Sequence, residues 1–217
     1  RAWAHIVDPL TYITIASTGA FLLAFVVIAL VRRRFALAAA AVCVVSVANV
    51  TTQLFKAYWP TQPHWWSNSL PSGHSTVAMS IATAALIVAP VGARRWLLPF
   101  AGFGVTFVGA GTLVGHWHRP ADVIAAFLLT TFLAAIALGV VQRVQHGRHP
   151  RDTSYAVRPV LSLAGSIGVG LIFVALGVRP LDHDVSLVLA FVSLVSIAVT
   201  AALTLAWISA AADDAVG

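Results

Sequence analysis

Charged side chains are scarce in this sequence: Asp, Glu, Lys and Arg make up only 9% of 217 residues, while 59% are hydrophobic. The mean hydropathy of +0.91 exceeds what a soluble domain of this size needs to build its core. In a soluble protein, a net charge of +6 would suggest nucleic-acid binding. In a membrane protein, basic residues are instead enriched in the loops on the cytoplasmic side of the membrane. We therefore expect an integral membrane protein and no nucleic-acid partner.

Cysteine is nearly absent as well. The single cysteine, Cys43, excludes an intrachain disulfide and leaves the redox compartment open. Long polar segments, low-complexity tracts and charge blocks are also missing, which excludes a large soluble domain. The chain begins at Arg1 rather than at methionine, so we expect further residues upstream.

Long apolar stretches are what the sequence has in abundance. A bilayer core of about 30 Å needs about 20 helical residues, and these stretches lack the alternation of barrel strands. They cover residues 10–31, 35–55, 75–91, 96–115, 121–141, 158–178 and 185–209. The sequence predicts an all-α, polytopic transmembrane bundle with about seven spans. The third stretch is the shortest, and its helix can extend backward through residues 69–75.

The chain is expected to form one membrane domain, with a weak internal boundary at residues 142–157. We expect a helical core over residues 1–141, a cytoplasmic loop over 142–157 and a C-terminal helical hairpin over 158–217. The fourth stretch is rich in glycine at small-xxx-small spacing, which favours close helix packing over a phosphate loop. Those glycines are Gly102, Gly104, Gly109, Gly111 and Gly115.

Arginine placement predicts the orientation. With residues 32–34 in the cytoplasm, nine basic residues fall in loops on that side and four on the other. The N-terminus is then outside and the C-terminus inside. Loops 56–74 and 116–120 then share the extracytoplasmic side. Basic residues are disfavoured on that side, so Lys56 and Arg119 are expected to have a specific function there.

Two polar clusters lie in these two loops. In Pro71-Ser72-Gly73-His74, a serine cap followed by glycine exposes backbone amides at the positive end of a helix, which suits an anion. Capping alone explains Ser72 equally well, but a cap does not need the titratable ring of His74. In the second cluster, His118 and Asp122 are four residues apart, so a carboxylate can orient the imidazole and leave its other nitrogen free to react.

The order Lys56, Pro71-Ser72-Gly73-His74, then His118 with Asp122 resembles the type 2 phosphatidic acid phosphatase superfamily of membrane lipid phosphatases. Its motifs read Lys-x6-Arg-Pro, Pro-Ser-Gly-His and Ser-Arg-x5-His-x3-Asp. The resemblance covers roughly residues 35–141, and the second motif matches in full.

The resemblance implies a role for each matching residue. His118 would be the nucleophile that becomes phosphohistidine, Asp122 would hold its ring, and His74 would be the general acid and then the base. Lys56, Ser72 and the Gly73 amide would hold the phosphate oxygens. The resemblance implies no metal or other cofactor. The run Asp182-His183-Asp184 is also a poor metal site, because adjacent residues rarely converge on one ion.

Both motif arginines are missing. The arginine and proline positions of the first motif hold Pro63 and His64, and the serine and arginine positions of the third hold Gly111 and Thr112. Each bidentate arginine contact is worth about 1.5–3 kcal/mol, so other groups must compensate. The candidates are Arg119, His116 and His64, of which Arg119 is favoured because it adjoins the proposed nucleophile.

Four aromatic residues precede the first cluster in the chain and indicate a membrane interface. They are Tyr58, Trp59, Trp65 and Trp66, which suit either an interfacial anchor or a lip for a lipid chain. We expect a multi-pass protein of a bacterial plasma membrane that hydrolyses a polyprenyl or glycerolipid phosphate or diphosphate outside the cytoplasm. Its partners are then the lipid-linked phosphate and membrane lipids. Two alternatives stay open: a phosphotransferase with the same site, or an accessory protein that lost activity with the arginines.

Overall fold

The computed structural model describes residues 8–12, 15–58, 70–145, 157–175 and 186–216. In these residues there are helices and no strands, so the all-α prediction is confirmed, and each predicted apolar stretch is a helix. The elements are η1 (Asp8–Tyr12), α2 (Ile15–Val31), α3 (Phe35–Tyr58), α4 (Gly73–Val88), α5 (Val91–Val114), α6 (Pro120–Val144), α7 (Val157–Ala175) and α8 (Leu187–Val216).

Four helices of the described part are long and apolar enough to cross a membrane: α3, α5, α6 and α8. Helices α2, α4 and α7 are apolar but shorter. Helix α4 begins at Gly73, which confirms that the third stretch extends backward into the serine-glycine-histidine segment. The protein is therefore a helical membrane protein, while the count of seven spans and their orientation stay predictions.

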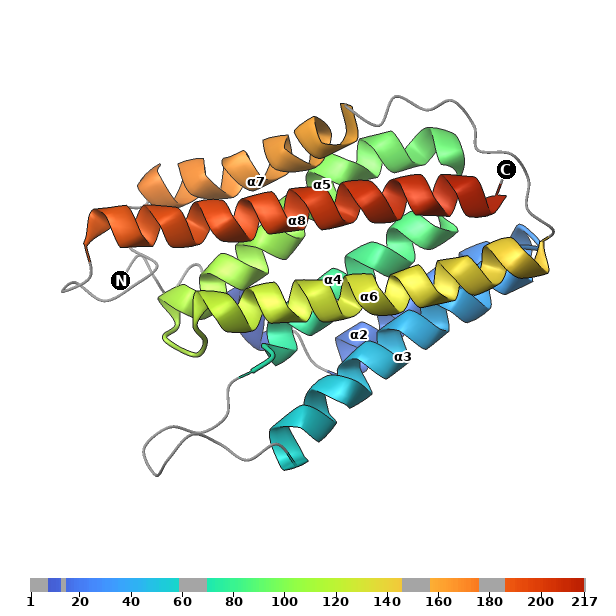
Figure 1. The fold of residues 1–217 in the computed structure, drawn as a ribbon, viewed down its shortest axis with the longest axis horizontal. Helices are drawn as coiled ribbons and strands as arrows, with labels where there is room; N and C mark the ends of the chain where they lie inside the picture. Colours follow the sequence, from blue (N-terminus) through green and yellow to red (C-terminus); the bar gives the residue numbers. More distant parts are fainter. Residues whose placement is uncertain (1–7, 13–14, 59–69, 146–156, 176–185, 217) are drawn as a thin grey trace.

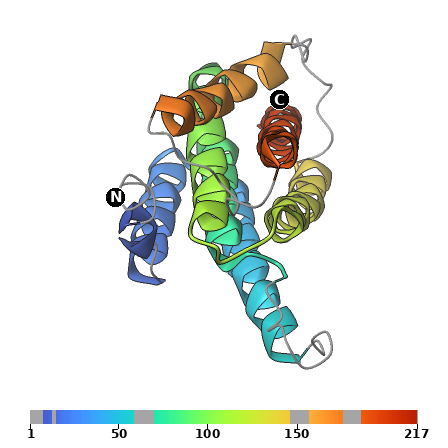
Figure 2. The same cartoon turned by 90° about the vertical axis from the view of Figure 1, so that its left-hand side faces the viewer.

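Helix α4 lies at the centre of the bundle and packs against α2, α3, α5, α6 and α8. The long helix α8 runs beside α6 and α7, as the two views show (Figures 1 and 2). Side chains of α4 such as Met79, Leu86 and Ile87 are fully buried. The helix that begins with Gly73 and His74 is thus held on several sides.

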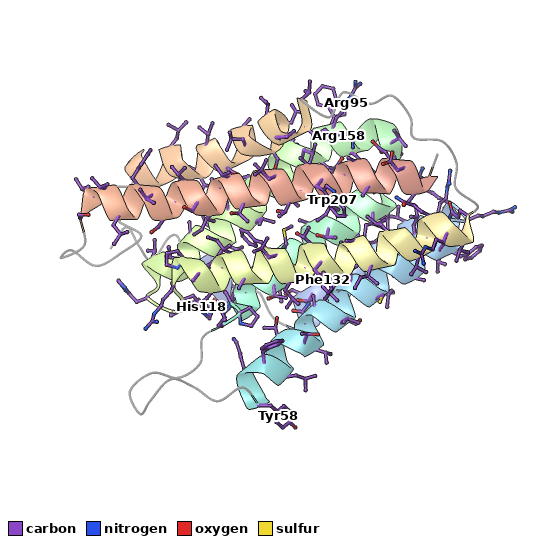
Figure 3. The ribbon with its side chains drawn as sticks, in the orientation of Figure 1. Tyr58, Arg95, His118, Phe132, Arg158 and Trp207 are labelled. Carbon is purple, nitrogen blue, oxygen red and sulfur yellow. The ribbon has the colours of Figure 1, made fainter. Side chains whose placement is uncertain are left out.

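Chain reversals bring the two predicted clusters to one end of the bundle. The C-terminus of α3 meets the N-terminus of α4 through Lys56 and Gly73, and the start of α6 meets it through the Ser72–Asp122 backbone bond. In Figure 3, His118 lies at the lower left, whereas Arg95 and Arg158 lie at the upper right. The described ends of loop 56–74, at Lys56 and residues 70–74, thus lie at the same end of the bundle as residues 116–120, and which side faces the cytoplasm stays a prediction.

Close helix packing at glycine is confirmed in part. A Cβ on Gly102 would collide with the carbonyl of Ser162 on α7, and one on Gly109 would come within 2.8 Å of Val123 on α6. Gly104 has no such neighbour within 4 Å, so its assignment as a packing residue is wrong. It is half-buried and lines a pocket between α2, α4 and α5, where packing requires no small residue.

The far end of the bundle holds a buried cluster of charged residues, the Arg94 cluster, made of Arg94, Arg158 and Asp213. Both arginines pair with the Asp213 carboxylate, and Arg94 donates to the carbonyls of Leu86 (2.8 Å) and Ile87 (3.1 Å) at the end of α4. Arg94 is one of the nine basic residues that the arginine distribution assigns to cytoplasmic loops, and this assignment is wrong: it lies in the first turn of α5 and is 1% exposed. Its burial is tolerated because a carboxylate and helix-end carbonyls satisfy it.

Candidate active site

Ser72 caps α4 and ties it to α6. Its hydroxyl oxygen accepts a hydrogen bond from the Ser75 N–H at 3.3 Å, and its own N–H donates to the backbone oxygen of Asp122 at 3.0 Å. Among the recorded hydrogen bonds of the described residues, the Gly73 and His74 amides make none, as expected for the first residues of a helix. The N-terminus of α4 therefore offers two amides to an anion, while the Ser72 side chain is buried and serves the cap.

Lys56 reaches this N-terminus from α3. One turn before it, the Thr52 hydroxyl lies 3.0 Å from the Thr76 hydroxyl of α4, and this contact joins the two helices. The Lys56 ammonium lies 3.3 Å from where a Cβ on Gly73 would sit. Glycine is therefore the residue that lets the ammonium approach the first amides of α4 this closely.

The second cluster is built by the turn between α5 and α6. His116 adopts a left-handed backbone (φ 56°), unusual for a residue other than glycine. Pro120 then occupies the first turn of α6. The Asp122 carboxylate accepts a hydrogen bond from the Arg119 N–H at 2.9 Å, so it caps the helix. This bond fixes the carboxylate beside His118.

His118 and Asp122 form the close pair that the spacing predicted. Nδ1 of His118 lies 3.5 Å from Oδ2 of Asp122, and their side chains are 9% and 6% exposed. At this distance Nδ1 has no hydrogen bond, although it is buried. A small movement of the ring would close this contact and direct Nε2 away from Asp122.

His74 joins the two clusters. It is close enough to interact electrostatically with His118 and Lys56, and Lys56 interacts in the same way with Asp122. The His74 ring also lies 5.2 Å from the Trp117 ring, centroid to centroid, at a tilt of 33°. Three helices and one turn thus place two imidazoles, an ammonium and a carboxylate within one small region.

A family model described as the PAP2 superfamily matches residues 50–146. This segment belongs to the PAP2 superfamily. It contains both clusters and runs from the second half of α3 to the end of α6. No curated protein and no solved structure matches the chain significantly. PAP2 membership together with the apolar helices supports a membrane protein of phosphatase type.

The remaining residues that the sequence analysis singled out are placed differently. His116 and Arg119 are exposed in the turn before α6. His64, Trp59, Trp65 and Trp66 lie outside the described residues, as does Asp182-His183-Asp184. Tyr58, at the end of α3, is 80% exposed (Figure 3). Among the described residues, no three His, Cys, Asp or Glu side chains lie close enough together to hold one metal ion.

Sequence reasoning missed several contacts in the PAP2 segment. The Thr52–Thr76 contact and the Ser72–Asp122 backbone bond join residues that are distant in the chain. The sequence analysis assigned no function to Trp117, although it adjoins His118. Its ring lies against that of His74. A signal did exist for Thr52: it is one helical turn from Lys56, so the two side chains share a face.

A groove of about 800 Å³ opens from this region between α2, α3 and α4. Lys56, Gly73 and His74 line its wall at the site end, while His118 is not among its lining residues. The groove therefore reaches the predicted phosphate-binding residues Lys56 and Gly73 and the proposed acid His74, but not His118.

Proposed function

We propose that the protein is a lipid phosphatase that hydrolyses a phosphomonoester or diphosphate through a phosphohistidine intermediate. The observation that carries this proposal is the meeting of His74, His118 and Lys56 at one end of the bundle. A nucleophile, a proton donor and a phosphate-binding cation are the groups that phosphoryl transfer needs.

In the first step, Nε2 of His118 attacks phosphorus and the bond from phosphorus to the lipid oxygen breaks. Asp122 stabilises the resulting positive ring through Nδ1, from which it is 3.5 Å away. His74 gives its proton to the departing oxygen. The products are the dephosphorylated lipid and phosphohistidine.

In the second step, water attacks the phosphohistidine. His74, now neutral, takes a proton from that water, the bond between phosphorus and Nε2 breaks, and inorganic phosphate leaves. His118 and His74 return to their starting protonation states. One imidazole thus serves as acid and then as base, which requires it to stay near the same oxygen position in both steps.

Phosphate binding depends on Lys56 and the α4 amides because the usual arginines are absent. The third motif's arginine position is Thr112, which is fully buried and donates to the carbonyl of Gly109 at 2.8 Å. It offers no replacement charge. Arg119 and His116 in the exposed turn are the described candidates for further contacts, and Ser72 contributes by orienting the amides.

A lipid substrate is supported by the setting of the site. The helices that carry it are apolar and membrane-like, and the groove beside Lys56 and His74 also has aliphatic lining residues such as Leu22, Leu54 and Val77. Such a setting excludes bulk water from much of the substrate and suits a chain attached to the phosphate. We propose that the site faces the extracytoplasmic side, as the arginine distribution predicts.

The test is a phosphate-release screen on purified protein with phosphatidic acid, phosphatidylglycerol phosphate, and a polyprenyl phosphate and diphosphate. We expect release from at least one lipid, with a loss of at least about 10³-fold in His118→Ala. Arg143→Ala, which removes an exposed cation at the far end of the bundle, is the control and should keep full activity. Release by His118→Ala at the wild-type rate would refute the mechanism. Release that requires an added lipid or sugar acceptor would indicate a transferase.

A further inference from the structure

A row of polar residues on α3 lines the groove beside the site. Along α3 its lining includes Ser46, Asn49, Gln53 and Lys56. Their spacing of three, four and three residues places them on one face of the helix. Aliphatic side chains from all three helices line the groove as well, among them Leu22 of α2, Leu54 of α3 and Val77 of α4, and Thr18 of α2 is a further polar lining residue. The groove is therefore amphipathic along its length rather than a plain hydrocarbon channel.

Gln53 is the unexpected residue in this row. It is exposed in the groove, and its amide makes no hydrogen bond recorded among the described residues. Asn49 is only half satisfied: its amide nitrogen donates to the Val45 carbonyl at 2.8 Å and to the Ser80 hydroxyl at 3.2 Å. No hydrogen bond to its side-chain oxygen is recorded in the described part. Polar groups that face lipid without partners are costly, so an amide here is expected to meet a polar ligand.

The row of polar residues also lies where the groups that follow the phosphate in a lipid would pass. With a rise of about 1.5 Å per residue, Gln53 is about 4.5 Å and Asn49 about 10.5 Å below Lys56 along the axis of α3. A phosphate held at Lys56 and Gly73 would have its lipid chain leave along this groove. The first groups after the phosphate would then pass Gln53.

We propose that Gln53, with Asn49 behind it, is a specificity site that binds the ester-bearing linker of a glycerolipid phosphate. The Gln53 amide N–H donates to an ester carbonyl, and the Asn49 side-chain oxygen faces the glycerol portion. This inference rests on the proposed function, because the phosphate position at Lys56 sets the register of the linker.

Substrate chemistry favours an ester lipid over a polyprenyl chain. An ester carbonyl follows the phosphate of a glycerolipid by a few bonds and accepts hydrogen bonds. A polyprenyl chain presents only hydrocarbon at that distance and would leave the Gln53 amide and the Asn49 side-chain oxygen unsatisfied. The same groove therefore discriminates between the two lipid classes by the polarity of the first few atoms after the phosphate.

The test measures binding rather than turnover. The protein carrying His118→Ala is mixed in detergent with equal amounts of dioleoyl phosphatidic acid and undecaprenyl phosphate, and native mass spectrometry gives the ratio of bound lipids. We expect a preference for phosphatidic acid that falls about three- to tenfold when Gln53→Leu is added. The ether analogue of phosphatidic acid, which lacks both carbonyls, should bind as weakly to the parent as the ester lipid binds to Gln53→Leu.

Thr51→Leu is the matched control, because Thr51 lies on α3 but does not line the groove; it should keep the preference. An unchanged ratio in Gln53→Leu, equal binding of the ether analogue, or a preference for undecaprenyl phosphate in the parent would each overturn the inference. These outcomes are separate from the phosphate-release screen. Wild-type protein that releases phosphate without any such preference would keep the proposed function and lose the specificity site.

Discussion

The backbone oxygen of Asp122 accepts a hydrogen bond from the Ser72 N–H at 3.0 Å. This bond joins the N-termini of α4 and α6, which carry the two halves of the proposed site. The side chain of the same aspartate lies against His118. Asp122 therefore fixes the position of the proposed nucleophile and, through Ser72, its distance from His74.

Asp122→Asn separates the capping role from the electrostatic role. Asparagine still accepts the hydrogen bond from the Arg119 N–H, so we expect the melting temperature to stay near that of the wild type. The charge beside His118 is lost, and kcat for phosphate release should fall about 10- to 10³-fold with little change in KM. Steady-state kinetics and thermal unfolding on the same preparations check this. Equal activity in the two proteins would show that the carboxylate does not act on His118.

Gly73→Ala tests the approach of Lys56 to α4. The added methyl group would lie 3.3 Å from the Lys56 ammonium, which ends a flexible side chain and can move aside. We expect stability to change little and KM for the lipid phosphate to rise by about three- to tenfold. Lys56→Met removes the cation itself and should weaken substrate binding by about 10- to 100-fold.

Gly92→Ala is the control for the first of these changes, because a Cβ on Gly92 meets nothing within 4 Å. Its KM should equal that of the wild type. If Gly73→Ala leaves KM unaltered while Lys56→Met raises it, the close approach to the α4 amides is not used for binding.

The Arg94 cluster should contribute to stability and not to chemistry. Arg94→Gln leaves Asp213 with one partner and withdraws donors from the carbonyls of Leu86 and Ile87, so we expect the free energy of unfolding to fall by about 3–5 kcal/mol. The adjacent Arg95 is exposed and stacks on Trp96 at 5.3 Å. Arg95→Gln should therefore change the unfolding temperature little. The folded fraction of both variants should retain wild-type kcat, and a selective loss of kcat in Arg94→Gln would contradict the purely structural role.

Much of the fold followed from the sequence because helix-length apolar runs are local signals. The start of α4 at Gly73 and the pairing of His118 with Asp122 also follow from short-range spacing. The partners of Arg94 could not be predicted this way, since Asp213 is 119 residues later in the chain. The same holds for the Ser72–Asp122 bond and the groove, which depend on how helices pack.

The proposed mechanism depends on a phosphohistidine at His118, and this intermediate can be trapped. An aryl phosphate with a nitrophenolate leaving group needs no proton from His74, so His74→Ala should still be phosphorylated but should hydrolyse the intermediate slowly. After an alkaline quench, peptide mass spectrometry is expected to find phosphate on His118 in His74→Ala and none in the His74→Ala, His118→Ala double variant. Phosphate on another residue, or turnover by His118→Ala at the wild-type rate, would show that His118 is not the nucleophile.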